Sequence, residues 1–335
     1  MNREEFYYEL PSQLIAQEPL AKRDAARLMV VDRKTKTIHH DIFSNINQYL
    51  PKHSMLVIND SKVIPARLFG RRKTGGCVEI FLLKRLVDGY SYEALLRPLK
   101  RLKEKEKIIF NGGRIVAEIK DKKNHIVTFN RKNIYRYLSQ IGHVPLPPYI
   151  KREDTPLDHQ YYQTVYARHP GSVAAPTAGL HITKVLINKL QNQGHAIKRV
   201  TLHINYATFK LVEENDIAQH KMHKEEYKTS KTVFDTICKA KKEGRKIVAV
   251  GTTSCRVLES VQQSRVLKGE TDLFIYPGFQ FQMVDILVTN FHLPFSTLLM
   301  LIYAFGGIDL MRKAYQEAIE GRYRFFSYGD AMLIL

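Results

Sequence analysis

The chain has 335 residues, of which 44% are hydrophobic, and its 52 Lys and Arg exceed its 33 Asp and Glu to give a formal charge of +19. This composition excludes a disordered chain and favours two domains, while the basic excess is typical of a protein that binds a polyanion. No apolar run reaches the roughly 18 residues of a membrane span. Three dispersed cysteines favour a reducing compartment, so we expect a cytoplasmic protein.

The first strands are predicted within "ARLMVVDR" and "SMLVINDSKVIP". The second of them ends at Asn59 and Asp60, with Lys62 following closely. Polar side chains at strand ends are typical of ligand sites in α/β sheets, so Asp60 is a candidate catalytic residue.

Short β-rich runs separated by turn signals such as "KTGG" and "NGG" follow, and they predict an antiparallel β-barrel. Between residues 66 and 130 the chain carries 16 Lys and Arg against 7 Asp and Glu, a net charge of 16 − 7 = +9. A solvated basic face, or a lineage rich in lysine, is the alternative explanation of this charge. The candidate polyanion contacts are Arg97, Lys100, Arg101 and Lys103.

After a predicted helix at 131–142 and a proline-rich link, helices and strands alternate. We expect helices at 183–194, 230–244, 252–263, 296–307 and 309–321, and strands at 196–206, 245–250, 272–278, 283–294 and 331–335. This alternation predicts a layered α/β/α domain formed by 1–64 and 150–335, into which residues 65–149 are inserted as the barrel.

The turn "GTTSCR" lies between a predicted strand and a predicted helix, where ligands bind in open α/β sheets. Its candidate ligand contacts are Thr252, Thr253, Ser254 and Arg256. An ordinary capped turn is the alternative interpretation. The chain has no Walker A loop and no G-x-G-x-x-G, so kinase and dinucleotide functions lack their usual support.

Several histidines stand in polar settings. Asn290 and His292 end a predicted strand in "TNFHLP", although a packed histidine is equally compatible with the pattern. In "HKMH", His220 and His223 lie one turn apart if the segment is helical, and with His203 they could bind a metal. Because no Cys or carboxylate stands at tight ligand spacing, we expect no metal site.

Long strings along the whole chain carry a resemblance. They include "VINDSKVIPARL", "GHVPLPPYIKR", "HPGSVAAPTAGLHIT", "VGTTSCRVLES", "TNFHLPFSTLLML" and "RYRFFSYGDAMLI". In these the chain resembles the S-adenosylmethionine:tRNA ribosyltransferase-isomerase family of queuosine biosynthesis. The resemblance implies S-adenosylmethionine as ribosyl donor and, as partner, a tRNA with a GUN anticodon that carries 7-aminomethyl-7-deazaguanine at the wobble position. The implied products are epoxyqueuosine-tRNA, adenine and methionine, and we expect a monomer.

The uncharged loop from Pro170 to Thr183 is then expected to form a wall of the donor or base pocket and to present His181, because small residues let backbone amides approach a ligand. Proton transfer suits histidine, so the catalytic candidates are His181, His292 and Asp60. The substrate-binding candidates are Ser172, Thr177, Gly179, Thr252, Thr253, Ser254, Arg256, Asn290, His203, His220 and His223, and the identity of the base stays open among the histidines.

The sequence departs from the family pattern at Asn205, Tyr206 and Ala207, where Gly-Leu-Gly is usual, and it contains no Trp. We expect this change to alter the shape of the local pocket. A non-catalytic RNA-binding protein and a phosphate-handling nucleotidyltransferase are the alternative functions.

Overall fold

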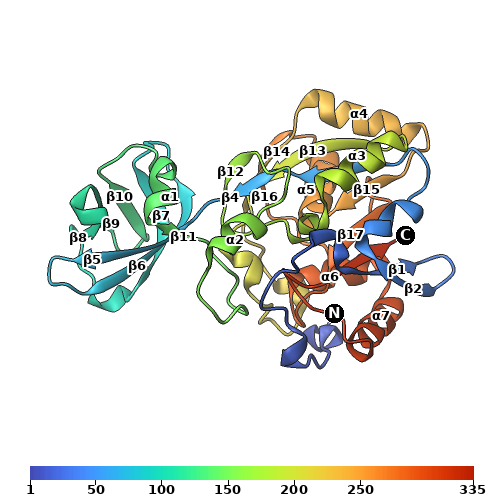
Figure 1. Cartoon of the computed structure of the whole chain (residues 1–335), viewed down its shortest axis with the longest axis horizontal. Coiled ribbons are helices and arrows are strands. Elements are labelled where there is room, and N and C mark those ends of the chain that lie inside the picture. Colours follow the sequence, from blue (N-terminus) through green and yellow to red (C-terminus); the bar gives the residue numbers. More distant parts are fainter.

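A computed structural model describes the backbone of residues 1–335 and every side chain except that of Ala207. The molecule has two unequal bodies joined by a narrow neck, with the smaller body at the left of Figure 1. Strands between residues 67 and 129 make up the smaller body, and both termini lie on the larger one. The expected effect of Ala207 on pocket shape lies outside the described residues.

A nine-stranded sheet forms the centre of the larger body. Its strands lie in the order β16 (Lys268–Thr271), β14 (Glu225–Lys228), β13 (Ala196–Leu202), β3 (Met55–Asn59), β15 (Ile247–Val250), β17 (Ile286–Asn290), β18 (Ala331–Ile334), β1 (Arg27–Asp32) and β2 (Thr37–Ile42). The four neighbours β13, β3, β15 and β17 are parallel, whereas β18 is antiparallel to β17. The carboxyl ends of the parallel strands therefore meet at one edge.

Helices cover both faces of this sheet, which confirms the predicted α/β/α layers (Figure 1). Within β3, Met55 and Val57 belong to one core and Leu56 and Ile58 to the other, because successive side chains of a strand point to opposite faces. The first core is covered by α4 (Lys231–Lys242), α5 (Thr252–Ser264), α6 (Thr297–Gly306) and α7 (Ile308–Glu320), and the second by α3 (Lys184–Asn192).

The smaller body is the predicted antiparallel barrel. Its strands follow the order β5 (Arg67–Arg72), β6 (Cys77–Arg85), β7 (Ser91–Arg97), β10 (Ile126–Phe129), β9 (Ile115–Asp121) and β8 (Lys107–Phe110). Pairing of β5 with β8 closes the barrel, so that neither strand is left as a free edge. Alternate residues such as Val78, Ile80 and Leu82 fill an interior of their own.

Two short pairings form the neck. In one, β4 (Ser61–Val63) runs parallel to β12 (His169–Ser172), and in the other β11 (Gly142–His143) joins the barrel beside β5. A Cβ at Gly142 would lie 2.2 Å from the carbonyl oxygen of Pro65, so the entering and leaving segments touch at a point that only glycine permits. The short helices α1 (Leu138–Ile141) and α2 (Pro156–Tyr161) flank this crossing.

Most predicted elements are confirmed, and the exceptions have local causes. The predicted strand at 272–278 is irregular, because the Leu273 carbonyl accepts from Arg256 Nε and its N–H donates to Thr271 Oγ1. The strand predicted at 196–206 ends at Leu202, whose N–H and C=O both bond to the Asn59 side chain.

Three helical expectations also differ from the structure in part or in full. The helix predicted at 131–142 is a 3-10 turn followed by the four residues of α1. The "HKMH" segment is not helical, so His220 and His223 are not stacked one turn apart. In α3, Leu186 and Leu190 are buried as expected, but Val185 is 76% exposed. Within the described chain, no helix has the length and apolarity needed to cross a membrane.

Candidate functional site

A cavity of about 710 Å³, counted with its open mouth, lies at the carboxyl ends of β15 and β17. Thr252 and Thr253 line it from the start of α5, and Asn290 and His292 line it from the end of β17. The structure thus brings the motifs "GTTSCR" and "TNFHLP" to one place, although they stand far apart in the sequence.

Only the first half of "GTTSCR" reaches this cavity. Gly251 has a φ of 88°, which a glycine adopts without strain and which lets the chain turn from β15 into α5. The Ser254 hydroxyl donates to the Val250 carbonyl at 2.8 Å, and Arg256 makes a buried ion pair with Glu225. Ser254 and Arg256 therefore hold the helix in place and do not line the cavity.

The uncharged loop forms the opposite wall through residues 174–178. Thr177 Oγ1 donates to Asn290 Oδ1 at 2.7 Å, which ties this wall to β17. His181 lies behind the wall, where Asn290 Nδ2 is 3.2 Å from His181 Nε2. Burial lowers the pKa of His181 to about 4, so its imidazole is neutral at pH 7 and can accept this hydrogen bond. In the described structure His181 lines a separate small hollow and meets the cavity only through Asn290.

Two further candidates from the uncharged loop, Ser172 and Gly179, contribute to packing. Ser172 Oγ accepts a hydrogen bond from the Ile204 N–H at 3.0 Å. A Cβ at Gly179 would lie 1.9 Å from the Tyr166 hydroxyl, so a glycine is needed there. Among the described residues, neither Ser172 nor Gly179 lines the cavity.

His292 does line the cavity. Its Nε2 lies 2.9 Å from Thr289 Oγ1, and its backbone N–H donates to the Tyr315 hydroxyl at 3.0 Å. Burial lowers the pKa of His292 to about 3. The cavity is therefore bordered by two neutral imidazoles, one in contact with it and one behind Asn290.

Three aromatic rings complete the cavity, and the motif analysis missed them. The Tyr149 ring centroid lies 4.7 Å from that of Phe326 and 6.0 Å from that of Phe209. The three rings come from distant segments, so no local spacing marks them as a group. The one sequence signal was that Tyr149 and Phe326 stand within strings that carry the family resemblance.

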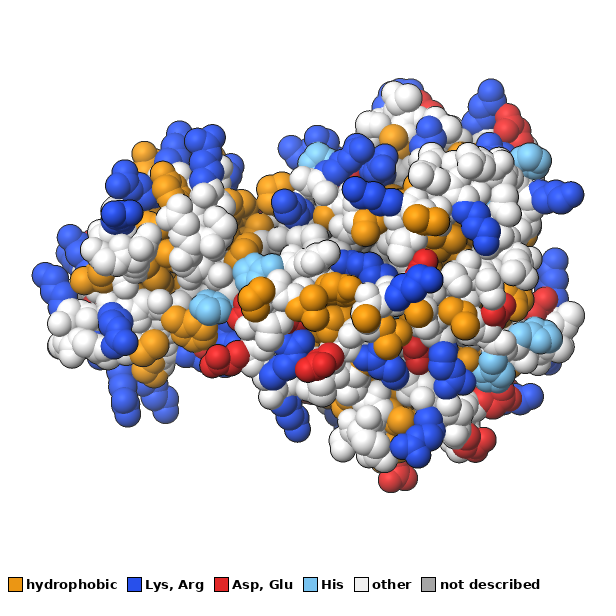
Figure 2. Space-filling view, viewed as in Figure 1, with side chains coloured by type: hydrophobic (Ala, Val, Ile, Leu, Met, Phe, Trp, Pro, Cys, Tyr) orange, Lys and Arg blue, Asp and Glu red, His pale blue; other side chains and the backbone are white. Residues whose placement is uncertain are grey.

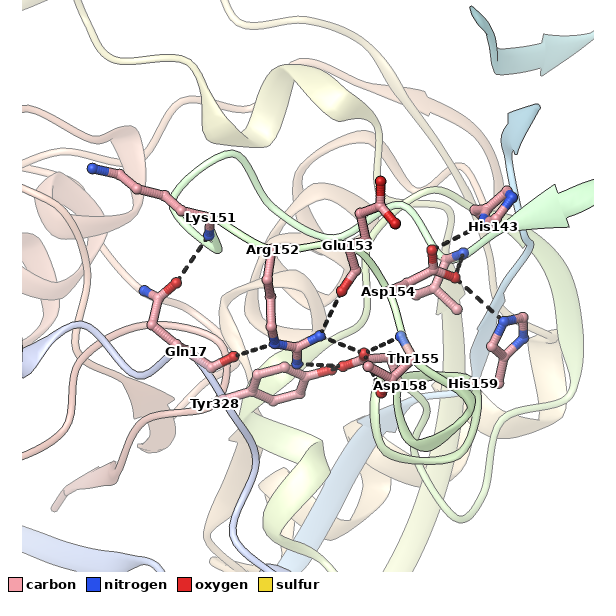
Figure 3. Close-up of polar contacts among 11 residues, drawn as sticks. Gln17, His143, Lys151, Arg152, Glu153, Asp154, Thr155, Asp158, His159 and Tyr328 are labelled. Carbon is pink, nitrogen blue, oxygen red and sulfur yellow. Dashed lines mark hydrogen bonds and ion pairs between the residues drawn. The ribbon is translucent and has the colours of Figure 1, made fainter. Parts of the chain in front are cut away.

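A buried polar network around Arg152 and Asp158, drawn in Figure 3, fixes the backbone of Tyr149 through Gln17. Asp158 accepts from both Arg152 Nη atoms at 2.7 and 2.9 Å and from the Tyr328 hydroxyl at 2.6 Å. Gln17 accepts from Arg152 Nε at 3.1 Å through its carbonyl and donates to the Tyr149 carbonyl at 3.0 Å through its side chain. Burial raises the pKa of Asp158, but the bonds from Arg152 and Tyr328 outweigh burial and lower it below its usual range.

A larger cleft of about 2410 Å³ separates the barrel from the nine-stranded sheet. Figure 2 shows Lys and Arg spread over the barrel, with Asp and Glu mostly on the larger body. The charged residues that line the cleft are Lys62, Lys84, Arg85, Arg136, Arg168, Lys224, Lys268, Glu225, Glu226 and Glu270. Seven cations against three carboxylates make this cleft suited to a polyanion.

His203 lines the cleft, whereas Asp60 is buried and meets the cleft wall through its carbonyl, which accepts from the Arg168 N–H at 2.8 Å. Thr201 Oγ1 donates to Asp60 Oδ1 at 2.7 Å, and Asp60 Oδ2 is 3.8 Å from His169 Nε2. Burial lowers the pKa of His203 below its usual range. A Cβ at Gly171 would lie 2.9 Å from His203 Nδ1, so glycine lets the ring approach the backbone.

The structure does not bring the remaining histidine candidates to either hollow. His220 Nδ1 is 2.9 Å from Glu214 Oε2, and its ring packs 5.4 Å from that of Phe274, while His223 is exposed. In the part of the chain that the structure describes, no group of three or more His, Cys, Asp or Glu is placed to hold a metal ion.

The predicted basic cluster lies away from the cleft. Arg85 lines the cleft and pairs with Tyr92 on β7, whereas Arg97 is five residues further along that strand. Five residues of strand span roughly 17 Å. The exposed cluster, at the far end of β7 and just after it, comprises Arg97, Lys100, Arg101 and Lys103.

Comparison with known proteins agrees with this architecture. A family model described as "Queuosine biosynthesis protein" matches residues 3–334. The S-adenosylmethionine:tRNA ribosyltransferase-isomerases of Carboxydothermus hydrogenoformans and of a Sulfurihydrogenibium species are 49% and 48% identical to this chain, each over 100% of both chains. The crystal structure of S-adenosylmethionine tRNA ribosyltransferase from Thermotoga maritima matches with a TM-score of 0.56 and 39% identity, covering 99% of this chain and 100% of that one. The chain therefore belongs to the queuosine biosynthesis protein family.

Proposed function

We propose that the cavity at β15 and β17 holds S-adenosylmethionine and that the cleft holds tRNA, for the S-adenosylmethionine:tRNA ribosyltransferase-isomerase activity of this family. The observation that carries the proposal is that the two hollows meet. Ile204 lines both of them, and the uncharged loop runs from the cleft at Pro170 and Gly171 into the cavity wall at 174–178. A ribosyl group in the cavity and a nucleotide in the cleft would meet beside Ile204.

The cavity suits a sulfonium donor. A sulfonium cation is attracted to aromatic faces, which Tyr149, Phe209 and Phe326 offer. The lowered pKa values of His181 and His292 leave both imidazoles uncharged at pH 7, so neither repels the cation. Thr252 and Asn290 add hydrogen-bonding groups that can orient the adenosine part.

On the RNA side, the substrate is a tRNA with a GUN anticodon that carries 7-aminomethyl-7-deazaguanine. The ribosyl part moves to the aminomethyl nitrogen, and adenine and methionine leave. Proton transfer falls to His203 beside Asp60 on the cleft side and to His292 on the cavity side. These three groups lie on either side of the junction at Ile204, which is where the reacting atoms meet.

The same proposal covers the organisation of the chain. Residues 65–149 form the inserted domain, and 1–64 with 150–335 form the catalytic domain, since the barrel has a core of its own. The enzyme acts as a cytoplasmic monomer. It needs no metal, because the sulfonium already provides an activated leaving group.

The reaction itself is tested by incubating the enzyme with S-adenosylmethionine and modified tRNA in EDTA. We expect epoxyqueuosine among the tRNA nucleosides, with adenine and methionine released in equal amounts. Unchanged aminomethyl-deazaguanine together with S-adenosylhomocysteine would contradict the proposal.

The junction is tested by Ile204→Phe, which places a larger side chain between cavity and cleft. We expect single-turnover rates to fall about 10²-fold while the Kd values of donor and tRNA stay within about threefold, because misplacing reactants costs rate more than affinity. Ile197→Phe, on β13 a few residues before Ile204 and outside both hollows, is the control. Equal losses of rate in the two variants would show that the junction is elsewhere.

A further inference from the structure

A lysine of the barrel reaches the larger body across the cleft. Lys84, near the end of β6, places its Nζ 2.8 Å from Glu270 Oε1 and 3.5 Å from Glu226 Oε1. All three side chains line the cleft. Of the seven cations that line the cleft in the described structure, Lys84 alone is ion-paired.

Neither sheet stability nor RNA binding accounts for the two glutamates. Glu226 on β14 and Glu270 on β16 are directly opposite each other in the antiparallel ladder. Like charges at such positions destabilise a sheet. In a cleft that binds RNA they would also repel phosphates. The arrangement is explained if their role is to bind Lys84.

We propose that Glu226 and Glu270 act as an internal competitor of RNA for Lys84. In the free enzyme they hold Lys84 and keep the barrel against the edge of the sheet, and an RNA phosphate that binds Lys84 releases this contact. The proposal rests on the tRNA substrate proposed above, and it adds an autoinhibitory contact to that site.

The strength of the contact suits this role. The side chains of Lys84, Glu226 and Glu270 are 42%, 53% and 38% exposed, and exposed ion pairs are weak and screened by salt. A polyanion that also engages the six unpaired cations of the cleft can therefore displace the glutamates. A short RNA that contacts Lys84 alone gains little over them, so the contact favours RNAs that fill the cleft.

The test is a mutant cycle on full-length protein, with a tRNA transcript of GUN anticodon as the probe and fluorescence anisotropy at low salt as the readout. E226Q with E270Q frees Lys84, and we expect tRNA affinity to rise about two- to fivefold, the range of exposed ion pairs. In the background of K84Q the same two changes should raise affinity distinctly less, because they then remove only the repulsion between the glutamates and phosphate. The gain should also vanish at about 1 M salt, where charges are screened within roughly 3 Å.

The cycle separates this contact from simple repulsion. If the two glutamates only repel RNA, E226Q with E270Q raises affinity equally with Lys84 or with K84Q, and the proposal is wrong. E9Q with E320Q removes two exposed carboxylates outside the cleft and controls for net charge. Turnover of modified tRNA by the wild type is measured separately, so failure of the proposed function is distinguished from failure of this inference.

Discussion

The cavity and the cleft offer different physical means of binding a ligand. The cavity is walled by aromatic rings and small uncharged residues, and its two histidines are neutral because burial lowers their pKa values. The cleft is wide and carries seven Lys and Arg. Affinity in the cavity should therefore depend on shape and on ring faces, and affinity in the cleft on ionic strength.

The cavity and the cleft also differ in the contacts that hold their walls in place. The cavity is fixed by buried bonds between distant segments, such as the hydrogen bond from the Tyr328 hydroxyl to Asp158. The cleft lies between two bodies joined by a neck, so its walls are held by few contacts. Variants in the cavity region should thus affect stability and donor binding, whereas cleft variants should affect RNA binding alone.

The largest effect is expected for Asp158→Ala. Removing this carboxylate leaves Arg152, Thr155 and Tyr328 without their common acceptor, and breaking such a buried pair costs about 3–4 kcal/mol of unfolding free energy. Because the pKa of Asp158 is lowered in the folded state, its contribution is complete above pH 4 and is lost below it. Urea unfolding at pH 7 measures the loss. A change under 1 kcal/mol would show that the network does not hold the cavity wall.

The second largest effect is expected on folding stability at low pH, where His181 becomes protonated. Its pKa is about 4 in the folded state against an ordinary value of 6.5, so between these values only the unfolded chain binds the proton. Stability should therefore fall by up to about 3 kcal/mol as the pH drops from 6.5 to 4. His181→Gln keeps a partner for Asn290 but cannot titrate. We expect a loss of about 1 kcal/mol at pH 7.5 and a shallower acid slope, and identical slopes would contradict a neutral, buried His181.

The third largest effect is expected from substituting cations that line the cleft. Lys62→Ala, Arg136→Ala and Arg168→Ala together should weaken tRNA binding about 10²-fold near 0.1 M salt and reduce the slope of log affinity against log salt by about two to three. The KM for S-adenosylmethionine should not change. The matched control removes the remote cluster of Arg97, Lys100, Arg101 and Lys103, and it should have a smaller effect. The opposite order would place the RNA along the far end of β7.

The fold could be predicted from sequence because its signals are local. The continuous apolar run of β1, the amphipathic spacing in α4 and the turn residues in the barrel each lie within one segment. The strand predicted at 272–278 failed because side chains of Arg256 and Thr271, from other elements, take the backbone groups of Leu273. A pattern of apolar residues in the sequence carries no information about such hydrogen-bond partners.

For the candidate site, the sequence indicated only those residues that stand at the ends of predicted strands. Thr252 and Thr253 were expected to follow one strand, and Asn290 and His292 to end another. The structure brings the four together because β15 and β17 are parallel neighbours. His181 was expected to face a ligand, yet it lies behind Asn290, since a histidine in a loop of small residues can turn to either side. Tyr149, Phe209 and Phe326 come together through tertiary packing, which no spacing in the sequence reveals.

The smallest effect, and the sharpest test of how the cavity differs from the cleft, is expected for Tyr149→Leu. Leucine retains apolar contact but removes the ring face, and a cation over such a face gains about 1 kcal/mol. The Kd of S-adenosylmethionine should therefore rise about fivefold to tenfold, while that of the uncharged thioether S-adenosylhomocysteine should rise less. Tyr149→Phe keeps the ring and loses only the hydroxyl bond to Ser327, so it should stay within about threefold of the wild type. These ratios should not vary with salt, unlike those of the cleft variants. If both ligands weaken equally in Tyr149→Leu, the ring contributes packing only, and the sulfonium is recognised by another part of the cavity.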